Sequence, residues 1–266
     1  MPDKIHVSPL HPDLPGNPGE CRNWGRLYGC SKALAVCKAA EESTKPLAII
    51  TADSLSASRL LLELRFFSDK SSDLSLYQFP DWETLPYDFF SPYQDIISER
   101  LETLFSLSSS ANGIVVVPVT TAMHRLLPRD YLMTNSLLLE TGQILDVASF
   151  RRDLSGRGYR FVAQVMEHGD VAVRGSLIDI FPMGVQNPYR IDLFDDEIDS
   201  MRSFDPETQR SLEKTEMIRV LPAREIPLVD EGIARFRSGW RMRFEGNPNQ
   251  CPIYRDVSQG LAPAGV

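Results

Sequence analysis

Gly113-Ile-Val-Val-Val-Pro118 is a run of four β-branched residues that ends at a proline. A short, continuously apolar run of this kind is typical of a strand buried on both faces in the middle of a parallel sheet. Leu47-Ala-Ile-Ile-Thr51 predicts a second buried strand, and residues 76–79 predict a short third one. These three segments are the predicted sheet of an α/β layer.

Helical spacing of apolar residues occurs between the predicted strands. It predicts a helix at 31–42, before the first strand. It predicts three more helices after that strand: the first begins at a cap formed by Asp53 or Ser54 and runs through Leu64, and the other two cover 97–107 and 121–127. Strands that alternate with helices indicate a doubly wound α/β layer.

The pattern changes after about residue 128. Asp146 can cap a helix over 147–155, and short strands separated by turn residues follow at 159–165, 171–180, 189–194, 198–204 and 216–221. This order predicts a smaller α+β domain with an antiparallel sheet. The expected organisation is a loose arm (1–24), an α/β domain (25–127), the α+β domain (128–214) and a segment with a helix over 229–244 that returns to the first domain (215–266).

The composition excludes several classes of protein. The chain has 266 residues with 28 basic and 36 acidic side chains, a formal charge of −8 that disfavours broad DNA binding driven by charge. No apolar run reaches the ~18 residues of a membrane helix, and the first residues lack the apolar core of a signal peptide, so we expect a cytoplasmic protein. The four cysteines form no CxxC pair, and no metal site is expected.

Alternation along residues 189–194 separates two faces of a strand. Tyr189, Ile191 and Leu193 form an apolar face, whereas Arg190 and Phe194 share the opposite one. Arg174, at the end of Val171-Ala-Val-Arg, faces outward by the same rule. Arginine beside an exposed aromatic is the composition of a protein interface, but an ordinary solvated face with Phe194 packed under the 147–155 helix is equally compatible with the pattern.

Three longer motifs resemble one known family. They are Asp-Trp-Glu-Thr-Leu-Pro-Tyr-Asp at 81–88 followed by residues 91–101; Gln-Val-Met-Glu-His-Gly at 164–169 with Arg-Gly-Ser-Leu-Ile-Asp-Ile-Phe-Pro at 174–182; and residues 189–199. Together they are similar to the N-terminal part of the bacterial transcription-repair coupling factors (Mfd), a part that is itself similar to the excision-repair protein UvrB. The resemblance runs from about residue 25 to the end.

The resemblance implies a function for the chain. In that family this region recruits UvrA, and the positions that match Arg174, Arg190 and Phe194 form the UvrA-binding surface. The family's RNA-polymerase-binding domain and its ATP-driven DNA translocase follow this region, and a C-terminal domain can cover the UvrA surface. The expectation is therefore a non-catalytic adaptor with a RecA-like first domain, cut from a longer chain.

The resemblance also locates a former nucleotide site. UvrB has the phosphate-binding loop Gly-Val-Thr-Gly-Ser-Gly-Lys-Thr, and the matching stretch here is Arg26-Leu-Tyr-Gly-Cys-Ser-Lys-Ala33. Gly29 and Lys32 remain, but Arg26 and Ser31 replace glycines, and Ala33 replaces the hydroxyl that holds Mg²⁺. We therefore expect no ATP hydrolysis and no cofactor, with Lys32 as a solvated lysine.

A nucleic-acid-binding or nucleotide-binding module closer to UvrB is the alternative. Its candidate residues are Tyr87, Phe89, Phe90 and Tyr93, which could stack on bases. We favour packing of these rings on the sheet instead, with Asp95 as a helix cap, because the acidic side chains around them would repel phosphates.

Overall fold

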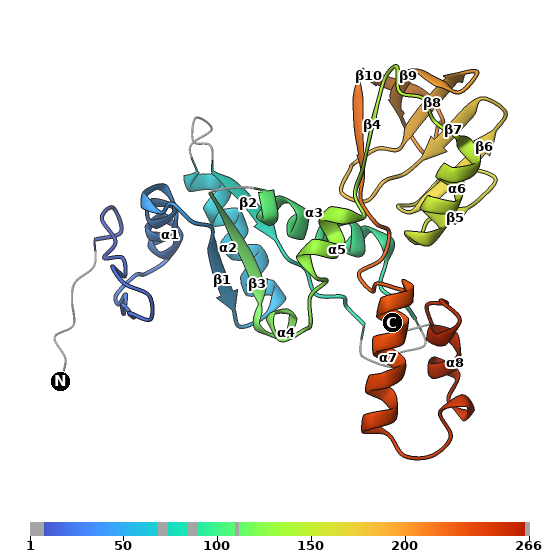
Figure 1. The fold of residues 1–266 in the computed structure, drawn as a ribbon. Coiled ribbons are helices and arrows are strands. Elements are labelled where there is room, and N and C mark those ends of the chain that lie inside the picture. Colours follow the sequence, from blue (N-terminus) through green and yellow to red (C-terminus); the bar gives the residue numbers. More distant parts are fainter. Residues whose placement is uncertain (1–7, 69–73, 85–89, 110–111, 264–266) are drawn as a thin grey trace. The chain divides into compact units, whose positions relative to one another are not determined.

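The computed structural model describes residues 8–68, 74–84, 90–109 and 112–263. The chain divides into two compact units (Figure 1). Unit 1 contains residues 1–81 and 106–124, and unit 2 contains residues 82–105 and 125–266. Each unit is described by itself below.

Unit 1 contains a three-stranded parallel sheet. Its strands are β1 (Leu47–Thr51), β2 (Ser75–Gln78) and β3 (Gly113–Pro118), in the order β1-β3-β2. The prediction of a central parallel strand at 113–118 is thus confirmed: Ile114 lies opposite Leu47 on one side and Leu76 on the other. The strand predicted at 47–51 is confirmed as β1, but the prediction that it is buried was wrong, because its residues alternate between half-buried and exposed.

The helix α2 (Ser54–Phe67) packs on this sheet, and α1 (Ser31–Glu42) packs on α2. Apolar residues of both helices form a single cluster with Ile114 and Val116. Asp53 caps α2 as predicted, since its carboxylate accepts a 2.7 Å hydrogen bond from the Ser56 backbone N–H. Hydrogen bonding to Ser56 also lowers the pKa of Asp53. Alternating strands and helices therefore form an α/β layer in this unit.

The predicted helix over 121–127 was wrong. The structure has a single turn, α4 (Val119–Ala122), and a separate helix, α5 (Arg129–Thr134), in unit 2. The backbone N–H groups of Met123 and His124 bond to carbonyls only three residues back. This tightened turn ends α4, and Pro128 stands directly before α5.

Unit 2 contains a six-stranded sheet in the order β10-β9-β8-β7-β6-β5. All neighbouring strands are antiparallel except β5 and β6. The strands are β5 (Arg160–Phe161), β6 (Asp170–Arg174), β7 (Leu177–Ile180), β8 (Tyr189–Phe194), β9 (Glu197–Phe204) and β10 (Ser211–Thr215). The antiparallel sheet expected for this part of the chain is confirmed in β6 to β10.

Several predicted strands differ from the structure. Residues 171–180 form a hairpin rather than one strand, because Gly175 takes a positive φ of 61° and turns the chain between β6 and β7. The strand predicted at 159–165 shortens to β5. Sequence analysis missed β10 and also β4 (Leu137–Glu140), which pairs antiparallel with β11 (Met217–Val220).

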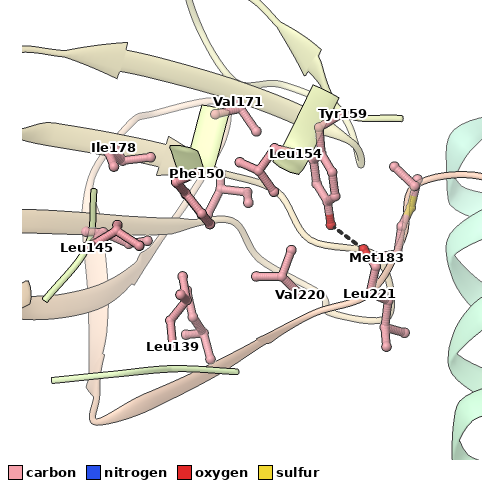
Figure 2. Close-up of a cluster of buried hydrophobic side chains, with 14 of the residues drawn as sticks. Leu139, Leu145, Phe150, Leu154, Tyr159, Val171, Ile178, Met183, Val220 and Leu221 are labelled. Atoms are coloured by element: carbon pink, nitrogen blue, oxygen red, sulfur yellow. Dashed lines mark hydrogen bonds between the residues drawn. The ribbon is translucent and has the colours of Figure 1, made fainter. Parts of the chain in front are cut away.

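The larger buried cluster of unit 2 lies on one face of the six-stranded sheet (Figure 2), and Val165, Ala172, Phe181 and Phe204 form a smaller, separate one. In the larger cluster, Phe150 and Leu154 of α6 (Val147–Gly156) pack with Val171 and Ile178, and Leu101 of α3 (Gln94–Ser109) joins them. The buried Tyr159 hydroxyl donates a 2.7 Å hydrogen bond to the Leu221 carbonyl, and burial raises its pKa. As predicted, Asp146 caps α6 through the Ala148 N–H.

The last helices are α7 (Asp230–Arg243), the short 3₁₀ turn η1 (Pro248–Gln250) and α8 (Pro252–Ser258), which was not predicted. The ring centroid of Tyr254 on α8 lies 5.9 Å from that of Phe236 and 5.7 Å from that of Trp240, both on α7. No residue of α7 is fully buried. Within the described ranges, no helix has the length and apolar character needed to span a membrane.

Candidate protein-interaction surface

The six-stranded sheet presents its second face away from the core of Figure 2. On β8, Ile191 and Leu193 are buried in that core, while Phe194 is 74% exposed. Arg190 shares the Phe194 side of the strand and is half-buried. The division of β8 into two faces therefore follows the alternation of its sequence.

A buried carboxylate on β7 brings the two predicted arginines together. Asp179 is only 1% exposed and lies directly opposite Arg190 on β8. Arg190 donates from Nε to Asp179 Oδ1 at 2.7 Å and from Nη2 to Oδ2 at 2.9 Å. Arg174, at the end of β6, donates to the same Oδ2. One carboxylate thus holds both guanidinium groups on this face.

The arginine geometry is further restrained by stacking and charge. The guanidinium carbon of Arg190 lies 4.8 Å from the centroid of the Phe204 ring. Its hydrogen bonds to Asp179 raise the pKa of Arg190. A two-point Arg–carboxylate contact combined with stacking fixes the direction in which the guanidinium points. Arg174 and Arg190 therefore form a preorganised cationic surface.

Phe194 ends β8 on the same side as Arg190, and its cross-strand neighbour is Glu197. The alternative in which Phe194 packs under α6 was wrong: α6 lies on the core face, and the phenyl ring is exposed. An exposed ring next to fixed arginines matches the composition of interface hot spots.

Sequence analysis missed Asp179 as a member of this surface. Its signal was present, because Asp179 interrupts the apolar run of Leu-Ile-Asp-Ile at 177–180. A charged residue inside such a run requires a buried partner of opposite charge.

The Asp179→Asn variant is expected to lose about 1–3 kcal/mol of unfolding free energy, because an amide replaces a carboxylate that accepts three charged hydrogen bonds. Urea denaturation followed by circular dichroism measures this loss. Asp192→Asn is the control, since Asp192 is partly exposed and its ion pair with Arg202 is long, at 3.9 Å. Equal effects of the two substitutions would contradict a structural role for Asp179.

The loop before α1 lacks the features of a phosphate site. Lys32 is exposed, Ala33 is fully buried in the unit 1 core, and the Ser31 hydroxyl donates to the Tyr28 carbonyl at 2.7 Å. Arg26 and Gly29 both have positive φ. A phosphate-binding loop connects a strand to a helix, but no strand leads into α1 within residues 8–31.

The aromatic residues and Asp95 in the segment before α3 do not have the environments that we expected. Phe90 and Tyr93 are exposed, so their predicted packing on the sheet was wrong; Tyr87 and Phe89 lie outside the described residues. The carboxylate of Asp95, which we expected to cap the helix, lies 2.7 Å from His168 Nδ1. Among described residues, no three His, Cys, Asp or Glu side chains are grouped to hold a metal ion.

Comparison with known proteins found a family model that matches the part of the chain containing this sheet. Residues 137–226 match the family model of the UvrB interaction domain, a range that contains Arg174, Asp179, Arg190 and Phe194. The second unit therefore contains a region that is similar to the UvrB interaction domain.

The chain as a whole is similar to the transcription-repair-coupling factors. It is 46% identical to the factor of Escherichia coli (strain K12) over 253 residues, which is 95% of this chain and 22% of that protein. It is 45% identical to the Haemophilus influenzae factor over 97% of this chain and 22% of that protein. It is 30% identical to the factor of Staphylococcus aureus (strain USA300) over 82% of this chain and 18% of that protein. The resemblance inferred from the sequence motifs is thus confirmed, and the chain spans about a fifth of the length of these relatives.

Proposed function

We propose that this chain is the UvrA-binding module of a transcription-repair-coupling factor and recruits UvrA during transcription-coupled nucleotide excision repair. The observation that carries the proposal is the arrangement of Arg174 and Arg190 on buried Asp179, on the same face of the sheet as exposed Phe194. All four residues lie in the range that matches the UvrB interaction domain. In this proposal Phe194 fills an apolar pocket of UvrA, and the arginines bind carboxylates.

The module has no catalytic activity of its own in this proposal. Unit 1 corresponds to a RecA-like layer whose nucleotide loop, residues 26–33, has lost two glycines and the Mg²⁺-binding hydroxyl. The parallel order β1-β3-β2 with intervening helices supports this assignment. We assign 25–127 to the RecA-like domain and 128–214 to the UvrA-binding domain. The segment 215–266, which we expected to return to the first domain, groups instead with unit 2, where its strand β11 pairs with β4.

The longer relatives suggest the context of the module. In the whole protein we expect RNA polymerase and duplex DNA to bind other domains, which would include an ATP-driven translocase. We also expect a C-terminal domain to cover the Phe194 face until UvrA is needed. Both expectations rest on the similarity to the coupling factors.

The test is a calorimetric titration of purified UvrA into this chain without DNA or nucleotide. Saturable binding is expected, together with an unchanged melting temperature when Mg²⁺-ATP is added, because a ligand that does not bind the folded state cannot stabilise it. Absence of UvrA binding would refute the proposal. An ATP-dependent rise in melting temperature, or salt-dependent binding of single-stranded DNA near Phe90 and Tyr93, would support the UvrB-like alternative.

A further inference from the structure

The arginine surface continues across the sheet beyond the three predicted residues. Asp179 on β7 lies opposite Arg190 on β8, Arg190 lies opposite Arg202 on β9, and Arg202 lies opposite Lys214 on β10. Residues directly opposite each other in antiparallel strands project from the same face. Three cations on three adjacent strands therefore form one row next to a single buried carboxylate.

This row is not what stability alone would favour. Like charges directly opposite each other in a sheet are destabilising. Asp179 is already shared by Arg190 and Arg174. The nearest acid recorded for Arg202 is Asp192, 3.9 Å from its Nη2, and no acid of the described residues lies within 4 Å of the Lys214 amine. Arg202 and Lys214 therefore carry positive charge that nearby carboxylates neutralise only weakly.

Arg202 also has unused hydrogen-bonding capacity. Its Nη2 donates to the Ser200 hydroxyl at 3.2 Å, but its Nε is shielded from solvent and has no acceptor among the described residues. The side chain as a whole is 33% exposed. A guanidinium recognises a carboxylate best through two parallel N–H bonds, which can involve Nε and one terminal nitrogen. A small rotation of the side chain would present that edge to a partner.

We propose that Arg202 is a further contact residue of the surface and binds a carboxylate of the partner. The interface then extends from β8 onto β9 and meets an acidic patch, with Lys214 adding attraction at longer range. This inference rests on the proposed function, since the partner is taken to be UvrA. Charge complementarity with the row of cations is the reason for an acidic partner surface.

The test compares variants of the full 266-residue chain in calorimetric titrations with UvrA. Arg202→Ala is expected to weaken binding by about tenfold or more, as for a buried interface arginine. Arg202→Lys should recover only part of the affinity, because it keeps the charge but loses the planar fork. Lys214→Ala should mainly slow association at low salt, an effect that disappears at high salt.

The matched control is Arg152→Ala. Arg152 is exposed on α6, whose buried side chains pack on the opposite, core face of the sheet, so its removal changes the net charge equally. Its effect on UvrA affinity should stay within about twofold. Circular dichroism and melting temperature confirm folding, and Arg202→Gln replaces Arg202→Ala if the latter does not fold.

Two outcomes overturn the inference separately from the proposed function. If UvrA binds the parent chain and Phe194→Ala abolishes this binding, but Arg202→Ala behaves like Arg152→Ala, Arg202 is not a contact. If Arg202→Ala leaves UvrA binding intact but abolishes binding of a duplex oligonucleotide, the row binds phosphates and not carboxylates. Lack of UvrA binding by the parent chain would instead remove the proposed function itself.

Discussion

Phe194→Ala is expected to weaken UvrA binding by about 2 kcal/mol or more, roughly 30-fold, because central aromatic anchors dominate interface energy. The same substitution should change the free energy of unfolding by less than about 0.5 kcal/mol. The reason for the difference is position: the Phe194 ring is 74% exposed and belongs to no core cluster of the described residues. Its apolar area is buried only when a partner covers it.

Phe90→Ala is the matched control for this prediction. Phe90 also belongs to unit 2 and is 76% exposed, so the two variants remove equivalent exposed rings. Calorimetry gives the affinity of each for UvrA, and thermal melting gives the stability. If both substitutions reduce affinity equally, or if Phe194→Ala has no effect in a folded chain, Phe194 is not the anchor.

Glu225→Ala is expected to lower the unfolding free energy by about 3–5 kcal/mol, because it removes a carboxylate that accepts two charged hydrogen bonds from a fully buried guanidinium. Arg100 on α3 is 0% exposed and binds Glu225 through two nitrogens, with Nη2 to Oε2 at 3.0 Å. The guanidinium carbon also lies 4.7 Å from the centroid of the Trp82 ring, whose Nε1 donates to Glu225 Oε1 at 3.2 Å. Glu225 thus contacts two residues that lie 125 and 143 positions earlier in the sequence.

An exposed pair of the same two residue types provides the control. Glu231 and Arg235 on α7 form a 2.8 Å ion pair with both side chains in solvent. Glu231→Ala should therefore cost no more than about 0.5 kcal/mol in urea denaturation. The double variant Arg100→Met with Glu225→Met should recover much of the stability that Glu225→Ala loses. No recovery, or equal losses for Glu225→Ala and Glu231→Ala, would show that the buried pair is not the cause.

Local sequence determined much of this protein. The apolar run at 113–118 was sufficient to predict the central strand β3, and alternation along 189–194 was sufficient to assign the two faces of β8. Both features depend only on backbone geometry and the polarity of successive residues. The loss of glycines and of a hydroxyl in residues 26–33 was likewise visible in the sequence alone.

Tertiary structure decided how these parts combine. The turn at Gly175 placed β7 between β6 and β8, and only this order brings Asp179 to both Arg174 and Arg190. The register of β9 and β10 then aligned Arg202 and Lys214 with Arg190. Neither fact follows from alternation, because strand neighbours and register depend on packing and chain closure between segments distant in the sequence. Alternation along each strand was thus enough to predict which residues face outward, but strand order and register set which of these residues are in contact.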